Sequence, residues 1–400
     1  MILAPRAATT RQGQGVVLLA LASGLASGVT LTAPGALETW LVADLRLSHG
    51  LAGLTQSAFF GGNLVGSLLV SWLLYRLRTR AVGLAALALL IAGNVLTASS
   101  GYLGLVAGRL LTGLGVSAAV VICSSLLVRA ADERRQAALL SGLHASIAAG
   151  AVLALAGARP LGRLLATWRA PFGVCALLGL VPLALLAALP LPATVAPDGG
   201  DDAQPPRLRA VVRTFGRPAV LVTLLLMAGY VLAEQGTTTF FAAYVEAAGL
   251  PPRTSALLAG LFWLGLGAGR LLAALALRRV SPARQLIGLT LIGLALLSGS
   301  AAVPASSAWL LLCGVVIAGA LLGPVIPLGF AVAVRQVDGL EGSVLGVGNA
   351  AACVGGTVGP WLVGAVADAS SLQAGLLTGY AICLACAAPF SLLAWRRRIR

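Results

Sequence analysis

The chain has 400 residues, of which 59% are hydrophobic and only 10% are charged. A soluble domain carries about 25% charged residues, so this composition excludes an ordinary water-soluble enzyme or binding module. The net charge is +15 and all 27 basic residues are arginines, but their placement along the chain indicates membrane orientation, and we expect no nucleic-acid partner.

Apolar windows of about 20 residues recur along the whole chain, which is the pattern of transmembrane helices. We predict an all-α membrane protein with twelve transmembrane helices in two pseudo-symmetric six-helix bundles. The first helix is too long for the core of a signal peptide, so we expect it to remain uncleaved. The predicted spans are 15–36, 50–74, 81–99, 102–128, 137–158, 171–192, 218–244, 254–277, 284–303, 307–334, 342–366 and 371–395.

The longest predicted connection, residues 193–216, is rich in Pro, Gly and Asp before it turns basic. It indicates a cytoplasmic linker between an N-terminal bundle, 1–192, and a C-terminal bundle, 217–400. The two halves also show a weak repeat, because the segment 144–150 matches 349–355 and Gly66 with Arg76 matches Gly269 with Arg279. Parallel six-helix halves around a site near the membrane midplane are a known plan of secondary transporters.

The arginines favour one side of the membrane. If both termini are cytoplasmic, most arginines fall in cytoplasmic loops. The opposite loops contain only Arg46, Arg159, Arg163, Arg169 and Arg253. This asymmetry follows the positive-inside rule. Because the chain lacks lysine and is rich in Ala, Gly and Arg, which is typical of GC-rich bacterial genomes, we expect it in a bacterial inner (plasma) membrane.

Glu234 is the only carboxylate well inside a predicted span. A charge at the bilayer centre costs about 2.5–3.5 kcal/mol even on lenient insertion scales, so such residues usually face a cavity and have a function. The polar run from Gln235 to Thr239 follows it and predicts a break in the helix beside that cavity. A buried carboxylate there can exchange protons near neutral pH. The alternative is a structural glutamate that an arginine neutralises.

Several motifs occur in an order that resembles the major facilitator superfamily over nearly the whole chain. They are Arg109-Leu-Leu-Thr-Gly113-Leu-Gly115, Trp168-Arg169-Ala-Pro-Phe172, the bend at Gly323-Pro324 and Pro327, and the run from Gly355 to Asp368. The resemblance implies a transporter without enzymatic activity, in which Gly113 and Asp368 have structural or gating roles. It implies the same for Arg76 and Arg80 in the loop after the second helix, although Tyr75 replaces the aspartate that the family prefers there.

The second half is similar to the fucose and glucose proton-symporter branch of that superfamily. The similarity rests on the run from Gly229 to Glu234, on Phe262-Trp263 and on Gly269-Arg270. It implies that Glu234 contacts solute and that Arg270 holds its helix at the inner rim. The first half differs from this branch, because its first and fourth helices lack the acids that the branch often has.

Further polar and aromatic residues on the spans are candidates for proton coupling or solute binding. Each has a structural alternative, because buried polar groups often bond between helices and aromatic rings often only pack. Arg109 could bind an anionic solute, and His144 could relay protons because its usual pKa is near 6.5. The remaining candidates are Asn349, which matches His144 in the repeat, and Tyr230, Gln235, Phe262 and Trp263.

We therefore expect a secondary active transporter that moves a small polar solute, a sugar or related metabolite, by proton-coupled uptake and alternating access. A proton-driven exporter of a drug-like compound or siderophore, a lipid flippase and a non-transporting membrane receptor are the alternatives. The coupling ion is a proton or another ion. No Walker A loop or HExxH motif occurs, so we expect no cofactor, no metal and no ATP-driven step. We expect a monomer.

Overall fold

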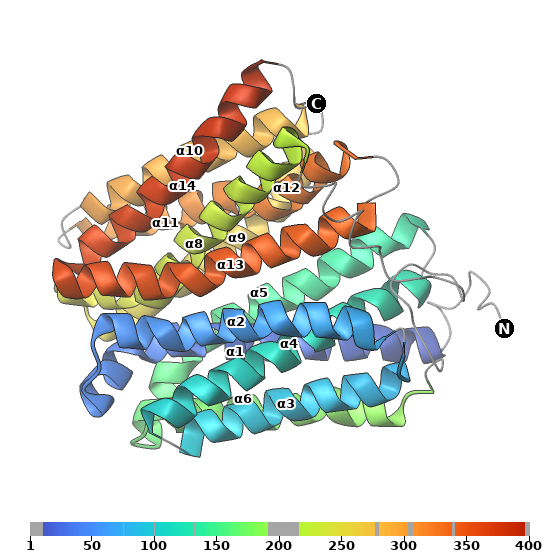
Figure 1. The fold of residues 1–400 in the computed structure, drawn as a ribbon. Helices are drawn as coiled ribbons and strands as arrows, with labels where there is room; N and C mark the ends of the chain where they lie inside the picture. The colour runs from blue at the N-terminus through green and yellow to red at the C-terminus, as the bar shows by residue number, and fades with distance from the viewer. Residues whose placement is uncertain are drawn as a thin grey trace. The chain divides into compact units, whose positions relative to one another are not determined.

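The computed structural model describes residues 11–74, 76–99, 101–130, 133–190, 216–276, 280–302, 307–337 and 341–396. Regular structure within these ranges is helical, without strands (Figure 1). The predicted linker 193–216 lies outside the described residues except for Gly216, and Tyr75 also lies outside them. The expected all-α class is confirmed.

The helices follow the predicted spans closely. Their bounds are α1 (Arg11–Leu45), α2 (His49–Leu73), α3 (Thr79–Ser99), α4 (Tyr102–Ala130), α5 (Glu133–Leu164), α6 (Ala170–Ala188), α8 (Pro218–Ala247), α9 (Pro252–Ala276), α10 (Pro282–Ala302), α11 (Ala308–Leu322), α12 (Val325–Val334), α13 (Glu341–Ala369) and α14 (Leu372–Trp395). Across the described ranges, 11 helical spans are long and apolar enough to cross a membrane, with α11 and α12 forming one of them. The chain is a multi-pass membrane protein.

The predicted bend at Gly323-Pro324 is where one span divides into two helices. Gly323 ends α11 and Pro324 precedes α12. A proline lacks the backbone N–H that continues a helix and its ring crowds the preceding turn, so the division is expected at this pair. Gly323 itself lies against the backbone of Leu266, so that a Cβ at this position would overlap the Leu266 carbonyl oxygen.

The chain forms two compact units that differ from a simple division into halves. Unit 1 comprises 1–33 and 58–205, and unit 2 comprises 34–57 and 206–400. The helices α1 and α2 therefore each run from one unit into the other. The boundary in α1 falls at Pro34, a proline inside the helix.

Close helix packing in unit 1 depends on glycines. A Cβ at Gly113 of α4 would overlap the carbonyl oxygen of Phe59 in α2, and one at Gly62 of α2 would overlap that of Leu110 in α4. Small residues allow helix backbones to approach in this way in lipid. The structural or gating role expected for Gly113 from its motif stays a prediction.

Unit 2 repeats the same arrangement. Gly319 of α11 lies against the carbonyl oxygen of Phe262 in α9, and Gly265 of α9 lies against that of Val316 in α11. The pair Phe59–Gly113 in unit 1 thus corresponds to the pair Phe262–Gly319 in unit 2. This reciprocal glycine packing supports the internal repeat more strongly than the short sequence matches do, because it involves two helices in each unit.

Many large apolar side chains on the helices are exposed. Leu103 and Leu164 are each 81% exposed, and Leu177 is 63% exposed. In water such surface would be costly, whereas lipid acyl chains are as apolar as leucine and accept it. The pattern fits helices whose outer faces contact a bilayer.

Candidate functional site

Glu234 lies in the middle of α8, the most buried of the spans, and is itself only 7% exposed. The side chains of Tyr230 and Gln235 lie beside its carboxylate, and Arg270 of α9 lies within electrostatic range. All four residues belong to unit 2. The structure thus brings together three of the predicted coupling or binding residues and one residue that was predicted to be structural.

The polar run after Glu234 does not break the helix, so that prediction is wrong. α8 continues from Pro218 to Ala247. The hydroxyl groups of Thr237, Thr238 and Thr239 donate to the carbonyl oxygens four residues earlier, at 2.7–2.9 Å. Threonine can satisfy its hydroxyl on its own helix in this way, so a polar run does not need an unwound backbone or a water-filled cavity.

Three polar atoms on α8 and α9 are buried without a hydrogen-bond partner among the described residues. They are the Tyr230 hydroxyl, the Gln235 Oε1 and the Trp263 Nε1. Tyr230 and Gln235 are on α8, and Trp263 is on the neighbouring α9. A buried polar group without a partner costs about 1–3 kcal/mol, so each such group needs an explanation. A bound polar solute or water would supply the missing partners.

Arg270 is half-buried on α9, and its Nε donates to the carbonyl oxygen of Gly323 at 3.0 Å. The glycines of the two helices explain this contact. Gly269, the residue before Arg270, lies against the backbone of Ala320, and Gly323 lies against Leu266. The guanidinium of Arg270 therefore holds the end of α11 while its charge acts on Glu234.

Arg109 is fully buried in α4 of unit 1. Its Nη1 donates to the carbonyl oxygen of Thr30 in α1 at 2.8 Å, and its Cζ lies 4.5 Å from the centre of the Phe59 ring. A guanidinium over an aromatic face is favourable, especially when it is removed from water. Both contacts tie α4 to neighbouring helices. Binding of solute by Arg109 stays a prediction.

The other predicted binding residues occupy varied places. His144 of α5 is exposed and belongs to unit 1. Asn349 of α13 is half-buried, and its Nδ2 lies 3.9 Å from the Cys353 Sγ. Phe262 is buried in α9, with its carbonyl against Gly319. Among the described residues no group of three or more His, Cys, Asp or Glu side chains could hold a metal ion.

Two arginines that were expected to have gating or structural roles lie in the loop after α2 and at the start of α3. Arg76 and Arg80 are both exposed, and the Arg76 Cζ lies 4.5 Å from the centre of the Trp72 ring. An exposed guanidinium over a tryptophan is worth about 0.5–1 kcal/mol. Gating by these arginines stays a prediction.

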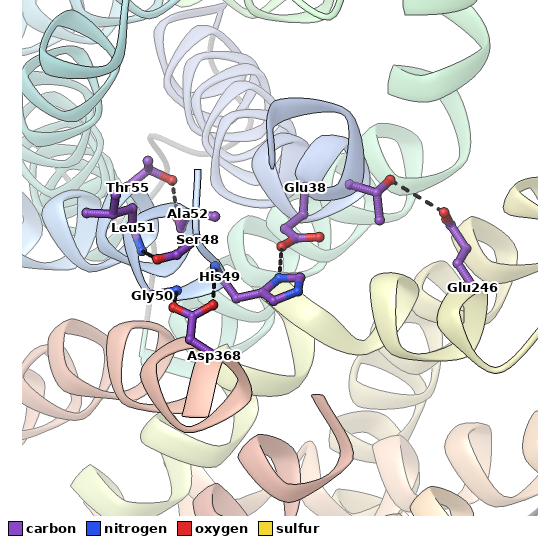
Figure 2. A network of polar contacts seen from close by, with 10 residues as sticks. Glu38, Ser48, His49, Gly50, Leu51, Ala52, Thr55, Glu246 and Asp368 are labelled. Atoms are coloured by element: carbon purple, nitrogen blue, oxygen red, sulfur yellow. Dashed lines mark hydrogen bonds and ion pairs between the residues drawn. The ribbon is translucent and has the colours of Figure 1, made fainter. Parts of the chain in front are cut away.

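A polar cluster that sequence reasoning missed lies where α1 ends and α2 begins (Figure 2). We call it the corner cluster; it comprises Glu38, His49, Gly50 and Asp368, all in unit 2. The His49 Nδ1 lies 2.8 Å from the Glu38 Oε1. The carboxylate of Asp368, near the end of α13, accepts the backbone N–H of His49 at 2.7 Å and that of Gly50 at 2.8 Å.

The corner cluster rests on close backbone packing and on two further contacts to α8. Gly364 of α13 lies against the His49 carbonyl oxygen. The Phe240 ring of α8 meets the His49 ring edge-on at 6.0 Å, and the Thr39 hydroxyl donates to Glu246 at 3.4 Å. Asp368 was a candidate from its motif alone. Glu38 and His49 gave no sequence signal, because both stand at predicted helix ends where charged residues are common.

Comparison with known proteins identifies the family. The model of the Major Facilitator Superfamily matches residues 16–360. The chain belongs to this superfamily. Its members are transporters and not enzymes, which agrees with the expected lack of enzymatic activity, and nothing supports a non-transporting receptor.

A curated transport protein of Escherichia coli is similar to part of the chain. The inner membrane transport protein YdhP of Escherichia coli (strain K12) is 28% identical over 211 residues, which is 52% of this chain and 52% of YdhP. The chain thus spans about half the length of the curated relatives that it matches.

Solved structures of superfamily members match most of the chain. The D-xylose-proton symporter has a TM-score of 0.76 at 18% identity, covering 96% of this chain and 97% of that chain. The nucleoside transporter NupG has a TM-score of 0.78 at 13% identity, covering 96% and 100%. A bacterial homologue of the human lysosomal transporter Spinster has a TM-score of 0.75 at 14% identity, covering 96% and 97%. At these identities the match shows the transporter fold.

Proposed function

We propose that this chain is a secondary active transporter that takes up a small polar solute together with protons, by alternating access between two six-helix bundles. In this proposal α2 is the twelfth span, beside the 11 identified by length and composition. Both termini lie in the cytoplasm of a bacterium, as the arginine distribution favours, and the protein works as a monomer.

The observation that carries the proposal is the buried carboxylate of Glu234 in the most buried span, which also carries the Tyr230 hydroxyl and the Gln235 Oε1, two buried polar atoms without a hydrogen-bond partner among the described residues. An intramembrane carboxylate is rare and usually lies on a solute or proton path. A solute with hydroxyl groups or other uncharged polar groups could bond to the two donors, on Tyr230 and Trp263, and to the acceptor on Gln235. The aromatic rings of Tyr230 and Trp263 could also pack against a ring-shaped solute. Similar folds serve the D-xylose-proton symporter and the nucleoside transporter NupG, whose names describe solutes of that kind.

The corner cluster has a place in this mechanism. Residues 34–57 contain the turn between α1 and α2 and lie in unit 2, whereas the remainder of both helices lies in unit 1. If the termini are cytoplasmic, this turn lies on the outer side. Access from outside then requires that the turn separate from α8 and α13, so the cluster acts as the outer gate.

The test uses the full-length protein in proteoliposomes with an imposed inward proton gradient. A thermal-shift screen against sugars, nucleosides and organic acids first selects the solute. Glu234→Gln keeps the size and removes the titratable group, so we expect loss of accumulation against a gradient while solute exchange continues. Glu133→Gln, at the start of α5 in unit 1, removes a carboxylate outside the candidate site and serves as the control, which should still accumulate solute.

Two results would contradict the proposal. Uphill accumulation by Glu234→Gln at the rate of the unmodified protein would remove this residue from coupling. Accumulation that requires an outward-directed proton gradient would show exchange of solute against protons and so favour an exporter.

A further inference from the structure

Arg109 and Arg270, which both lie inside membrane spans, share a feature that their charge alone does not explain. In an α-helix each backbone N–H donates to the carbonyl four residues earlier, and a proline, which has no N–H, leaves that carbonyl without its bond. Pro34 lies inside α1, and the carbonyl four residues earlier belongs to Thr30. Between α11 and α12 the backbone of Gly323 and Pro324 keeps right-handed helical dihedral angles, so the helical path continues to Pro327, and the carbonyl four residues before Pro327 belongs to Gly323.

Each of these two carbonyls accepts a hydrogen bond from an arginine on another helix. Arg109 of α4 donates to Thr30, with 2.8 Å between Nη1 and the oxygen. Arg270 of α9 donates to Gly323, with 3.0 Å between Nε and the oxygen. The two contacts occur in different units, so the same chemistry arises twice with different helices.

In a membrane, a hydrogen bond from an arginine to such a carbonyl should stabilise the helix more than it would in water. A helix carbonyl in a bilayer core has no water to bond, and a proline in a transmembrane helix is tolerated where a neighbour satisfies the freed group. A guanidinium has five N–H donors in a planar fork and reaches across to a neighbouring helix. A donor that carries a charge also forms a stronger bond to a carbonyl than an amide does.

We propose that Arg109 and Arg270 are positioning residues, each of which supplies to a proline-interrupted helix the hydrogen bond that the proline removes. Arg109 holds α1 at the point where that helix passes from unit 1 into unit 2, and Arg270 holds the junction of α11 and α12. The inference deepens the proposed function and rests on it where transport is measured. The measurement of stability does not depend on the proposed function.

A double-mutant cycle on the full-length protein in detergent, without solute, tests the proposal. Arg270→Ala removes the donor, and Pro327→Ala returns a backbone N–H to the Gly323 carbonyl. We expect Arg270→Ala to lower Tm by about 2–4 °C, and we expect the double variant to regain most of that loss. The parallel cycle joins Arg109→Ala with Pro34→Ala on the Thr30 carbonyl.

The control combines Arg270→Ala with Pro389→Ala, which removes a helix-internal proline of α14. Pro389→Ala changes Tm by itself, so the comparison is the loss caused by Arg270→Ala, which should be the same with and without Pro389→Ala. If Arg270→Ala does not yield folded protein, Arg270→Gln keeps an N–H donor without the charge, and it should retain more stability than Arg270→Leu.

Rescue by the matching proline substitution supports the proposal, because that substitution restores a backbone donor but no charge. If Pro327→Ala and Pro34→Ala give no more recovery than Pro389→Ala, the arginines act through their charge or by contacting solute, and the proposal is overturned. Transport measured on the same variants separates the two hypotheses. A protein that moves no solute at all, yet shows the rescue in Tm, contradicts the proposed function and leaves this inference standing.

Discussion

His49 and Glu38 meet across the turn between α1 and α2, with 2.8 Å between the His49 Nδ1 and the Glu38 Oε1. The His49 side chain is 30% exposed and that of Glu38 only 3% exposed. One member of the pair is thus accessible to solvent protons while the other is held in the protein. Their bond, with the contacts of Asp368, joins this turn to α13 within unit 2.

The first prediction concerns pH. The hydrogen bond to Glu38 raises the pKa of His49 above its usual value of 6.5; burial lowers it, and the charges of Glu38 and Asp368 raise it further. A pKa that is higher in the folded protein means that protonation stabilises the fold. The contribution of His49 is therefore complete below pH 6.5 and is lost as the pH rises through the pKa of the folded state.

Thermal unfolding of the unmodified protein and of His49→Gln between pH 5 and pH 9 measures this contribution. The difference in Tm between the two should be largest at acid pH and should decline at alkaline pH. In Glu38→Gln the pH dependence should become weaker, since the main cause of the raised pKa is gone. A difference that stays constant with pH would show that His49 does not titrate in this range.

The second prediction concerns the two hydrogen bonds that Asp368 accepts from the first turn of α2. Asp368→Ala removes both acceptors and a negative charge at a helix N-terminus, and we expect a loss of about 0.5–2 kcal/mol, the usual cost of losing a cap. Asp368→Asn keeps one acceptor oxygen and should lose less. Tm measurements compare the two, and equal losses would mean that the charge alone matters.

The third prediction uses two adjacent glycines of α2. A Cβ at Gly62 would overlap the carbonyl oxygen of Leu110, whereas a Cβ at Gly61 meets nothing within 4 Å. Gly62→Ala should therefore destabilise the protein by about 1–3 kcal/mol, as overpacking does. Gly61→Ala should be neutral or slightly stabilising, because alanine favours a helix more than glycine does. Similar losses at both positions would contradict the close packing of α2 and α4.

The fourth prediction concerns the polar atoms without partners near Glu234. Tyr230→Phe and Trp263→Phe remove a buried hydroxyl and a buried indole N–H that lack partners among the described residues. Without solute, loss of the indole N–H in Trp263→Phe should not cost stability through a lost hydrogen bond, although the variant also has a smaller ring, whereas Tyr230→Phe also removes a hydroxyl that lies beside the Glu234 carboxylate. With solute, the KM should rise several-fold for a group that bonds it. Unchanged transport together with reduced Tm would assign the residue to the core.

Much of the fold followed from patterns that are local in the sequence. Apolar runs of membrane length predicted the spans, and the resemblance of Gly323-Pro324 and Pro327 to a superfamily motif predicted a bend at the place where α11 ends and α12 begins. Both depend on a few consecutive residues, so one sequence is enough to find them. The break predicted after Glu234 was wrong, and the reason is again local. Each threonine of the polar run donates its hydroxyl to a carbonyl of its own helix, so the helix continues.

By itself the chain determined that it fills a membrane, that it resembles one superfamily of transporters and that one carboxylate lies in the middle of a span. Tertiary structure alone decided which groups face one another: Arg109 with Thr30, Arg270 with Gly323, and Asp368 with the start of α2. Hydrophobic periodicity is a property of neighbouring residues, and it places each helix in lipid. The partner of a buried polar group depends on which helices approach closely, and helices that meet can be separated by hundreds of residues.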